Sequence, residues 1–91
     1  MSEKNKQITN TIIQTLDFPQ DLFLGLPNIS LCGNAEIYIS NHRGILSYDE
    51  ESTNILVKNN QIQIKGKGLS ILSYTQDELT IRGYIRSLEF I

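Results

Sequence analysis

The chain has 91 residues, with eight lysines and arginines against ten aspartates and glutamates, which gives a net charge of −2. The two signs are interspersed and offer no field to attract nucleic acid or an anionic membrane, while the length suits one domain with a modest core. A single cysteine excludes an intramolecular disulfide, the start lacks a signal-peptide core, and no apolar run nears the roughly 20 residues of a spanning helix. We therefore expect a cytoplasmic protein without a membrane span.

The first twenty residues differ in pattern from the rest. Residues 1–6 are polar, and we expect a frayed tail. In residues 7–16 apolar side chains recur at helical spacing, which predicts a short amphipathic helix: Ile8, Ile12, Ile13 and Leu16. So short a helix is not stable alone and needs a surface on which to pack. We favour packing on the sheet of the same chain, with a partner or a membrane as the alternatives. Pro19 breaks the pattern, so residues 1–20 form a tail and helix, and residues 21–91 an antiparallel β domain.

The β domain alternates short apolar segments with turn residues. Turns are predicted at Gly33-Asn34, 41–44, 49–52, Asn59-Asn60, 66–68 and 75–78. The fold class is thus all-β: a single antiparallel meander sheet of about seven or eight short strands, curled or barrel-like, preceded by the helix. A parallel β-solenoid of short coils is the alternative.

The predicted turns also fix the pairing of the strands. A turn at Asn59-Asn60, with positive φ at both residues, sets Val57 opposite Ile62 and Ile55 opposite Ile64. The other turns predict the pairs Ile39–Leu46, Ile37–Tyr48, Tyr48–Thr53, Leu46–Ile55, Ile62–Leu72, Tyr74–Leu79 and Leu72–Ile81, and they place Ser30 and Cys32 on the face of Ile37. One face then carries the predicted core: Ile37, Ile39, Leu46, Tyr48, Ile55, Val57, Ile62, Ile64, Leu72, Tyr74, Leu79 and Ile81.

The opposite face is not purely polar, because it carries Tyr38, Ile45, Leu56, Leu69, Ile71 and Tyr84. A sheet with one solvated face alternates more cleanly. We therefore expect this face to be covered in part by the N-terminal segment, by curling of the sheet, or by another subunit. Unpaired first and last strands would add edges for pairing, so a homo-oligomer or a tight hetero-complex is predicted.

Residues that carry chemistry do not gather in the sequence. His42 is the only histidine and is interpreted as a solvated turn residue, and Cys32 as a small, half-buried hydrophobe. The acidic run 49–51 is interpreted as a solvated turn, with calcium binding as the minority interpretation. The segment 65–68 resembles half of a phosphate loop but lacks the rest of that motif. We predict no catalytic residue, cofactor or metal site.

Several short motifs together resemble the YabP/YqfC family of sporulation proteins, more closely the YqfC type. The resemblance spans about residues 16–91 and depends on Leu26-Pro27, Gly33-Asn34, Tyr38-Ile39, Asn41-His42-Arg43-Gly44, 57–66 and 82–85. It implies a role in endospore formation in the mother-cell compartment, and it implies no catalytic residues.

The Asn41-His42-Arg43-Gly44 motif also has a physical interpretation. Asn41 and Gly44 suit positions with positive φ, so that His42 and Arg43 project from the loop, either to contact a partner or, for Arg43, to pair with Asp49 or Glu50.

The leading hypothesis is a non-enzymatic protein that acts as a protein-binding scaffold or assembly factor in sporulation. Its partners would be proteins of the sporulation machinery, with membrane-associated ones included. The alternative is a small-ligand or regulatory module that uses the interior of the curled sheet. The candidate partner-binding residues are Asn41, His42, Arg43, Tyr38, Leu56, Leu69 and Tyr84.

Overall fold

The computed structural model describes residues 24–91, so the predicted helix and the boundary at residue 20 lie outside the described residues. The described chain is all-β, with strands β1 (Asn28–Cys32), β2 (Glu36–Ser40), β3 (Gly44–Tyr48), β4 (Ser52–Val57), β5 (Asn60–Tyr74) and β6 (Glu78–Phe90). They form one antiparallel sheet in the order β1-β2-β6-β5-β4-β3. The sheet does not close, because β1 and β3 remain its two edges.

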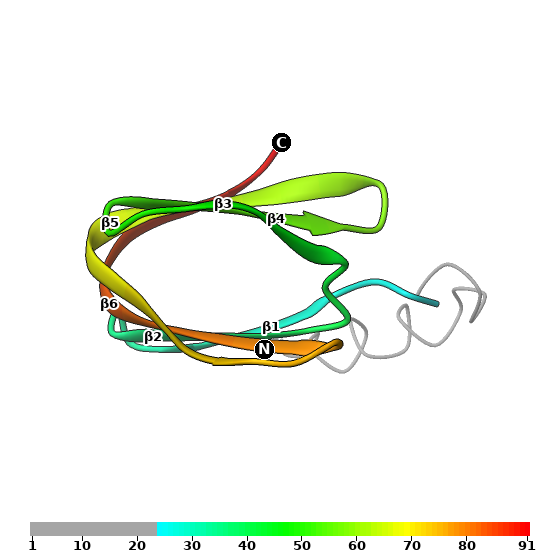
Figure 1. The fold of residues 1–91 in the computed structure, drawn as a ribbon, viewed down its shortest axis with the longest axis horizontal. Coiled ribbons are helices and arrows are strands. Elements are labelled where there is room, and N and C mark those ends of the chain that lie inside the picture. The colour runs from blue at the N-terminus through cyan, green and yellow to red at the C-terminus, as the bar shows by residue number, and fades with distance from the viewer. Residues whose placement is uncertain (1–23) are drawn as a thin grey trace, which may run out of the picture.

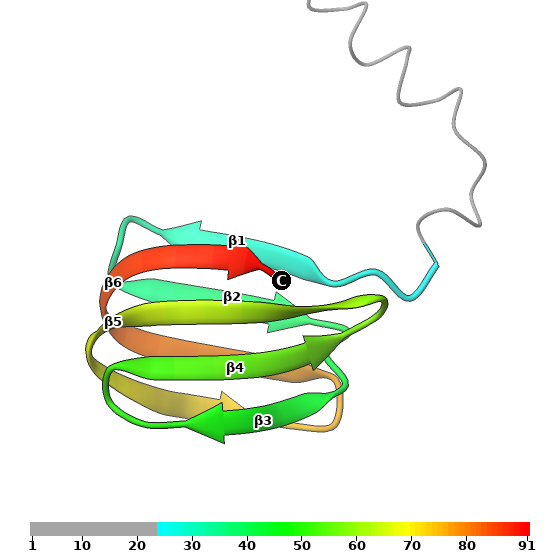
Figure 2. The same cartoon turned by 90° about the horizontal axis from the view of Figure 1, so that it is seen from above.

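The sheet folds over on itself, so that two layers face each other (Figure 1). The long strands β5 and β6 run through both layers. The first part of β5 pairs with β4 and with the last part of β6, whereas the last part of β5 pairs with the first part of β6, which also pairs with β2. One layer therefore holds β3 and β4, and the other holds β1 and β2 (Figure 2).

Glycines permit the bend of the two long strands. A Cβ on Gly66 would overlap the Tyr84 carbonyl, and one on Gly83 would lie 2.7 Å from the Gly68 carbonyl oxygen. The prediction of a turn at 66–68 is therefore wrong. The glycines let two backbones approach closely inside one continuous hairpin. As a result, β5 and β6 each take the place of two short strands, and six strands are found instead of seven or eight.

The turn between β4 and β5 lies one residue earlier than predicted. Val57 pairs with Asn60, so the turn residues are Lys58 and Asn59, and only Asn59 has a positive φ, of 73°. The predicted turn with positive φ at both asparagines is wrong. The register moves by two residues, with Ile55 opposite Ile62, and a shift of two leaves every side chain on its predicted face.

Other pairings differ from the meander. β2 pairs with β1 and β6 and not with β3, so the Ile39–Leu46 and Ile37–Tyr48 pairs do not form. The turn after β1 spans three residues, which sets Leu31 opposite Ile37 and leaves Cys32 exposed. The predicted inward placement of Ser30 and Cys32 is therefore wrong.

Bulges change the inward residues of two strands. Irregular pairing in β3 turns Ile45 toward the core and leaves Leu46 half exposed, and the same occurs in β5 with Ile71 and Leu72. Because a bulge inserts one residue, it reverses the alternation beyond it. Tyr48 pairs with Thr53, and Tyr74 with Leu79, as predicted, but both tyrosines are exposed.

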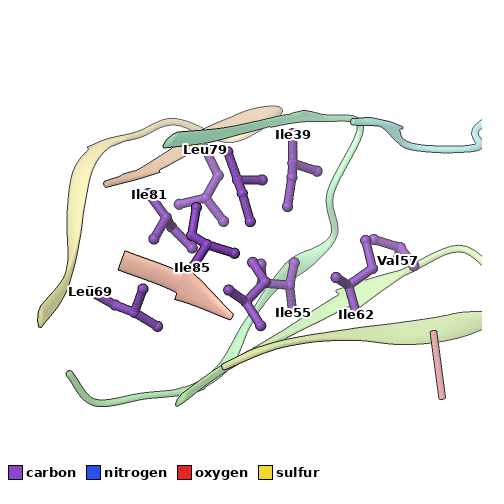
Figure 3. Close-up of a cluster of buried hydrophobic side chains, with 10 residues drawn as sticks. Ile39, Ile55, Val57, Ile62, Leu69, Leu79, Ile81 and Ile85 are labelled. Atoms are coloured by element: carbon purple, nitrogen blue, oxygen red, sulfur yellow. The ribbon is translucent and has the colours of Figure 1, made fainter. Parts of the chain in front are cut away.

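The space between the layers is filled by apolar side chains from both of them (Figure 3). The buried set comprises Ile37, Ile39, Ile55, Val57, Ile62, Ile64, Leu69, Leu79, Ile81 and Ile85. Leu69 is 1% exposed, so its predicted place on the outer face is wrong.

Candidate functional site

The segment Asn41–Arg43 crosses from β2 in one layer to β3 in the other. The backbone N–H groups of Asn41 and His42 both donate to the Asp77 carbonyl, at 2.7 and 3.4 Å. Asn41 has a φ of 64°, as predicted, and its side-chain amide donates to the Leu26 carbonyl at 3.1 Å. The crossover is thus fastened to both the β5–β6 turn and the chain before β1.

His42 is buried, with 5% of its surface exposed, so its interpretation as a solvated turn residue is wrong. The Gly44 N–H donates to Nδ1 at 3.0 Å, and Nε2 lies 2.9 Å from the Thr75 carbonyl oxygen. With Nδ1 as an acceptor, Nε2 is the ring nitrogen that faces the Thr75 carbonyl as a donor. The ring also stacks on Tyr74, with centroids 5.3 Å apart. His42 therefore joins the two layers.

Arg43 is the exposed cationic residue of the crossover. Its N–H donates to the Leu56 carbonyl at 2.7 Å, which places the residue beside β4. Its guanidinium reaches toward Gly25, where a Cβ would lie 3.9 Å from Nη2. Among the described residues the ion pair is Arg82–Glu36, at 3.7 Å, so the predicted pairing of Arg43 with Asp49 or Glu50 does not form.

A shallow hollow of about 470 Å³ adjoins Arg43 on the outside of the layer that holds β3 and β4. Leu56 and Ile91 lie in it, with 37% and 57% of their surfaces exposed. Leu56 pairs with Gln61, and Gln61 and Ile91 exchange two backbone hydrogen bonds of 2.9 Å, so these residues form a row across neighbouring strands. We call this hollow the Arg43 depression, which is lined by Arg43, Leu56, Val57, Asn59, Asn60, Gln61 and Ile91.

A second hollow, of about 420 Å³, lies on the other side of Arg43. It is lined by His42, Arg43, Gly44, Tyr74, Gln76 and Asp77. Arg43 therefore stands on the rim between two hollows. A guanidinium in this position can bind a carboxylate through two parallel hydrogen bonds while its stem packs on apolar surface.

Of the candidate residues, the structure brings Leu56 next to Arg43 of the crossover, and it places Tyr38, Leu69 and Tyr84 elsewhere. Tyr38 lies in the opposite layer, on β2. Desolvation of its phenol and, second, the nearby Glu78 carboxylate raise the pKa of Tyr38. Tyr84 is exposed and pairs with Lys67 at the bend, while Leu69 belongs to the core.

Ile91 and Gln61 were not predicted as site residues. The two residues come together through a long-range contact, because Ile91 pairs with Gln61 at the start of β5, and no local sequence pattern predicts this pairing.

The remaining polar candidates have structural roles. The Asp49 carboxylate accepts hydrogen bonds from the N–H groups of Glu51 and Ser52, at 2.7 and 2.9 Å, which is the chemistry of a turn. Lys65 and Lys67 lie at the bend, in a hollow of about 370 Å³ shared with Glu51 and Arg86. Within residues 24–91 no three His, Cys, Asp or Glu side chains gather as a metal site would require.

Comparison with known proteins identifies the family to which this chain belongs. Residues 26–91, which include every described strand, match the model of the YabP family. The chain belongs to the YabP family. It is also 29% identical to the uncharacterized protein YqfC of Bacillus subtilis (strain 168), over all of this chain and 98% of that protein. No solved structure matches the chain. None of the described segments forms a helix that is long and apolar enough to cross a membrane.

Proposed function

We propose that the chain is a non-enzymatic protein of endospore formation that acts in the mother cell as a scaffold or assembly factor. Its membership of the YabP family supports the sporulation role. On this proposal the Arg43 depression is the surface that binds another protein of the sporulation machinery.

The observation that carries the proposal is the presence of an exposed arginine beside two exposed aliphatic side chains in one hollow. Arg43, Leu56 and Ile91 line the same depression. Binding energy at protein interfaces concentrates in such places, where an arginine or an apolar anchor enters a pocket that excludes water. The matching partner surface would present an apolar side chain next to a carboxylate.

The interior of the folded sheet is less favourable for a small-ligand function. The core side chains of both layers meet there and are almost completely buried (Figure 3). A ligand pocket needs a cavity of roughly 300 Å³ or more, which would require these side chains to move apart.

The test is capture of partners by photo-crosslinking in sporulating cells, combined with a count of heat-resistant spores. A photo-crosslinking residue at Gln61, on the floor of the depression, should yield a defined adduct. Leu56→Asp should reduce that adduct at least about tenfold, which corresponds to a loss of about 1.4 kcal/mol of binding free energy. Leu72→Asp is the matched control, because Leu72 is an equally apolar, half-exposed side chain in the other layer.

The expected result is that Leu56→Asp lowers both the adduct and the spore count, while Leu72→Asp leaves both unchanged. Equal effects of the two variants would contradict the assignment of the depression. Spores formed at the normal level without the gene would contradict the sporulation role itself.

We also propose that the chain self-associates through β3. This strand is an edge of the sheet, and its Leu46 is 50% exposed. An unpaired edge with an exposed apolar side chain can pair with a second copy about a two-fold axis. Sedimentation at micromolar concentration should give the mass of two chains, and Leu46→Lys should return it to one. A single-chain mass for the unaltered protein would contradict this proposal.

A further inference from the structure

Figure 2 shows β1 beside the last part of β6 at one side of the folded sheet. An apolar groove is lined by residues of these two strands. It has a volume of about 550 Å³, and its lining includes Ile29, Leu31, Gly33, Ile85, Leu88 and Phe90. Ile29 and Leu88 pack on the core, whereas Leu31 and Phe90 are 58% and 56% exposed. The groove is therefore an exposed continuation of the hydrophobic core.

On the opposite side of the fold, the two layers are joined near the bend. There the Tyr48 hydroxyl donates to the Leu69 carbonyl at 2.6 Å, and the Leu69 N–H donates to the Glu50 carbonyl at 2.9 Å. On the groove side, the Ile85 N–H donates to the Asn34 carbonyl at 2.8 Å at the bend, and Lys58 Nζ donates to the Leu24 carbonyl at 2.6 Å just before β1. The groove exposes large apolar side chains to water between these two bridges.

We propose that residues 7–16 of the same chain dock in this groove as an amphipathic helix. The apolar stripe of that segment comprises Ile8, Ile12, Ile13 and Leu16, and the segment carries no charged residue. A helix of ten residues is about 15 Å long. The groove follows β1 from Ile29 to Gly33, which is about 13 Å along a strand. The lengths and the chemistry of the two surfaces match.

The point where the described chain begins supports this occupant over others. The Leu24 carbonyl accepts a hydrogen bond of 2.6 Å from Lys58 Nζ, and the Leu26 carbonyl is bound by Asn41. These contacts fix the chain just before Asn28, where β1 enters the groove. Residues 17–23 can extend over roughly 23 Å, which is enough for the preceding segment to turn back along β1.

The covalent link also favours the chain's own segment. A segment tethered by a short flexible linker experiences an effective concentration in the millimolar range. A separate chain that made the same contacts would have to reach that concentration to compete. Pro19 stands at the start of the linker and separates it from the helical pattern.

The test uses the full chain with a photo-crosslinking residue in place of Leu31. Irradiation should join position 31 to residues 7–16, as mapped by mass spectrometry. A mixture of unlabelled and ¹⁵N-labelled chains distinguishes adducts within one chain from adducts between two. Leu72 is the control position, because it is half exposed on β5 and does not line the groove. A photo-crosslinking residue there should give no adduct with residues 7–16.

Two substitutions in the segment make the test specific. Ile12→Asp lies within the apolar stripe and should reduce the adduct at least about fivefold. Gln14→Asp lies on the opposite side of the same helical wheel and should leave it unchanged. Circular dichroism of both variants should retain the β signal of the sheet.

Adducts within one chain that are lost in Ile12→Asp and kept in Gln14→Asp would support the proposal. Adducts between light and heavy chains would overturn it in favour of a second copy. The absence of an adduct with residues 7–16, or equal adducts in both variants, would also overturn it. The groove and the Arg43 depression are separate surfaces, so either result leaves the proposed partner site to its own test.

Discussion

Replacement of His42 by alanine should destabilise the fold strongly, because its ring joins the two layers. The ring binds two backbone groups, the Gly44 N–H and the Thr75 carbonyl, and stacks on Tyr74. Each hydrogen bond contributes about 0.5–1.5 kcal/mol net, and a stacked pair about 0.5–1.5 kcal/mol beyond its buried area. We therefore expect His42→Ala to lower the free energy of unfolding by about 2–4 kcal/mol.

Urea unfolding followed by circular dichroism measures this change, with the slope of the transition as a check on two-state behaviour. Arg43→Ala is the matched control next to it and should cost under about 0.5 kcal/mol, because the side chain is exposed. His42→Phe retains a ring for stacking but loses both hydrogen bonds, so we expect an intermediate loss. A His42→Ala variant as stable as Arg43→Ala would mean that the ring is solvated and that this reasoning is wrong.

Three further predictions, with six substitutions, test the backbone and the core. Asn59→Gly should be neutral and Asn59→Val should cost about 1 kcal/mol or more, because Asn59 has the positive φ, while Asn60→Val should be tolerated; equal urea midpoints for the two valine variants would contradict this turn. Ile62→Ala should cost roughly 2–4 kcal/mol and Gln63→Ala under about 0.5 kcal/mol, and the reverse order in urea would mean that the faces are exchanged. Gly66→Ala should lose the folded dispersion signal in proton NMR, and a native spectrum would show that the strands do not approach so closely.

The pairings that the sequence predicts correctly are those between neighbouring strands. Tyr48 opposite Thr53 and Tyr74 opposite Leu79 follow from short turns whose residues identify them. Even the turn that was wrongly predicted at Asn59-Asn60 keeps the buried faces of β4 and β5, because a shift of two residues preserves the alternation. Local turn chemistry and a period of two are thus enough to predict an all-β chain and most of its core.

The errors arise where long-range contacts or irregular backbone decide the structure. The pairing of β2 with β6 joins residues about 40 positions apart, and the local pattern fits a β2–β3 hairpin equally well. The segment 66–68 has the composition of a turn, and only the approach of the Tyr84 backbone shows that it is a bend. Bulges hide the inward residues in a similar way, since Ile45 and Leu46 are both apolar and the alternation does not choose between them.

The Asn41-His42-Arg43-Gly44 motif shows how far a sequence motif identifies a site. Its backbone requirements were predictable, because Asn41 and Gly44 both have positive φ, at 64° and 136°. The role of His42 was not predictable, because its partner Thr75 lies 33 residues away and no local sequence pattern indicates that contact. The residues of the crossover thus have two different roles. Asn41, His42 and Gly44 hold the two layers together, whereas Arg43 is the exposed cationic side chain on the rim of the depression. Substitution of the first three should therefore act through stability, and substitution of Arg43 through binding.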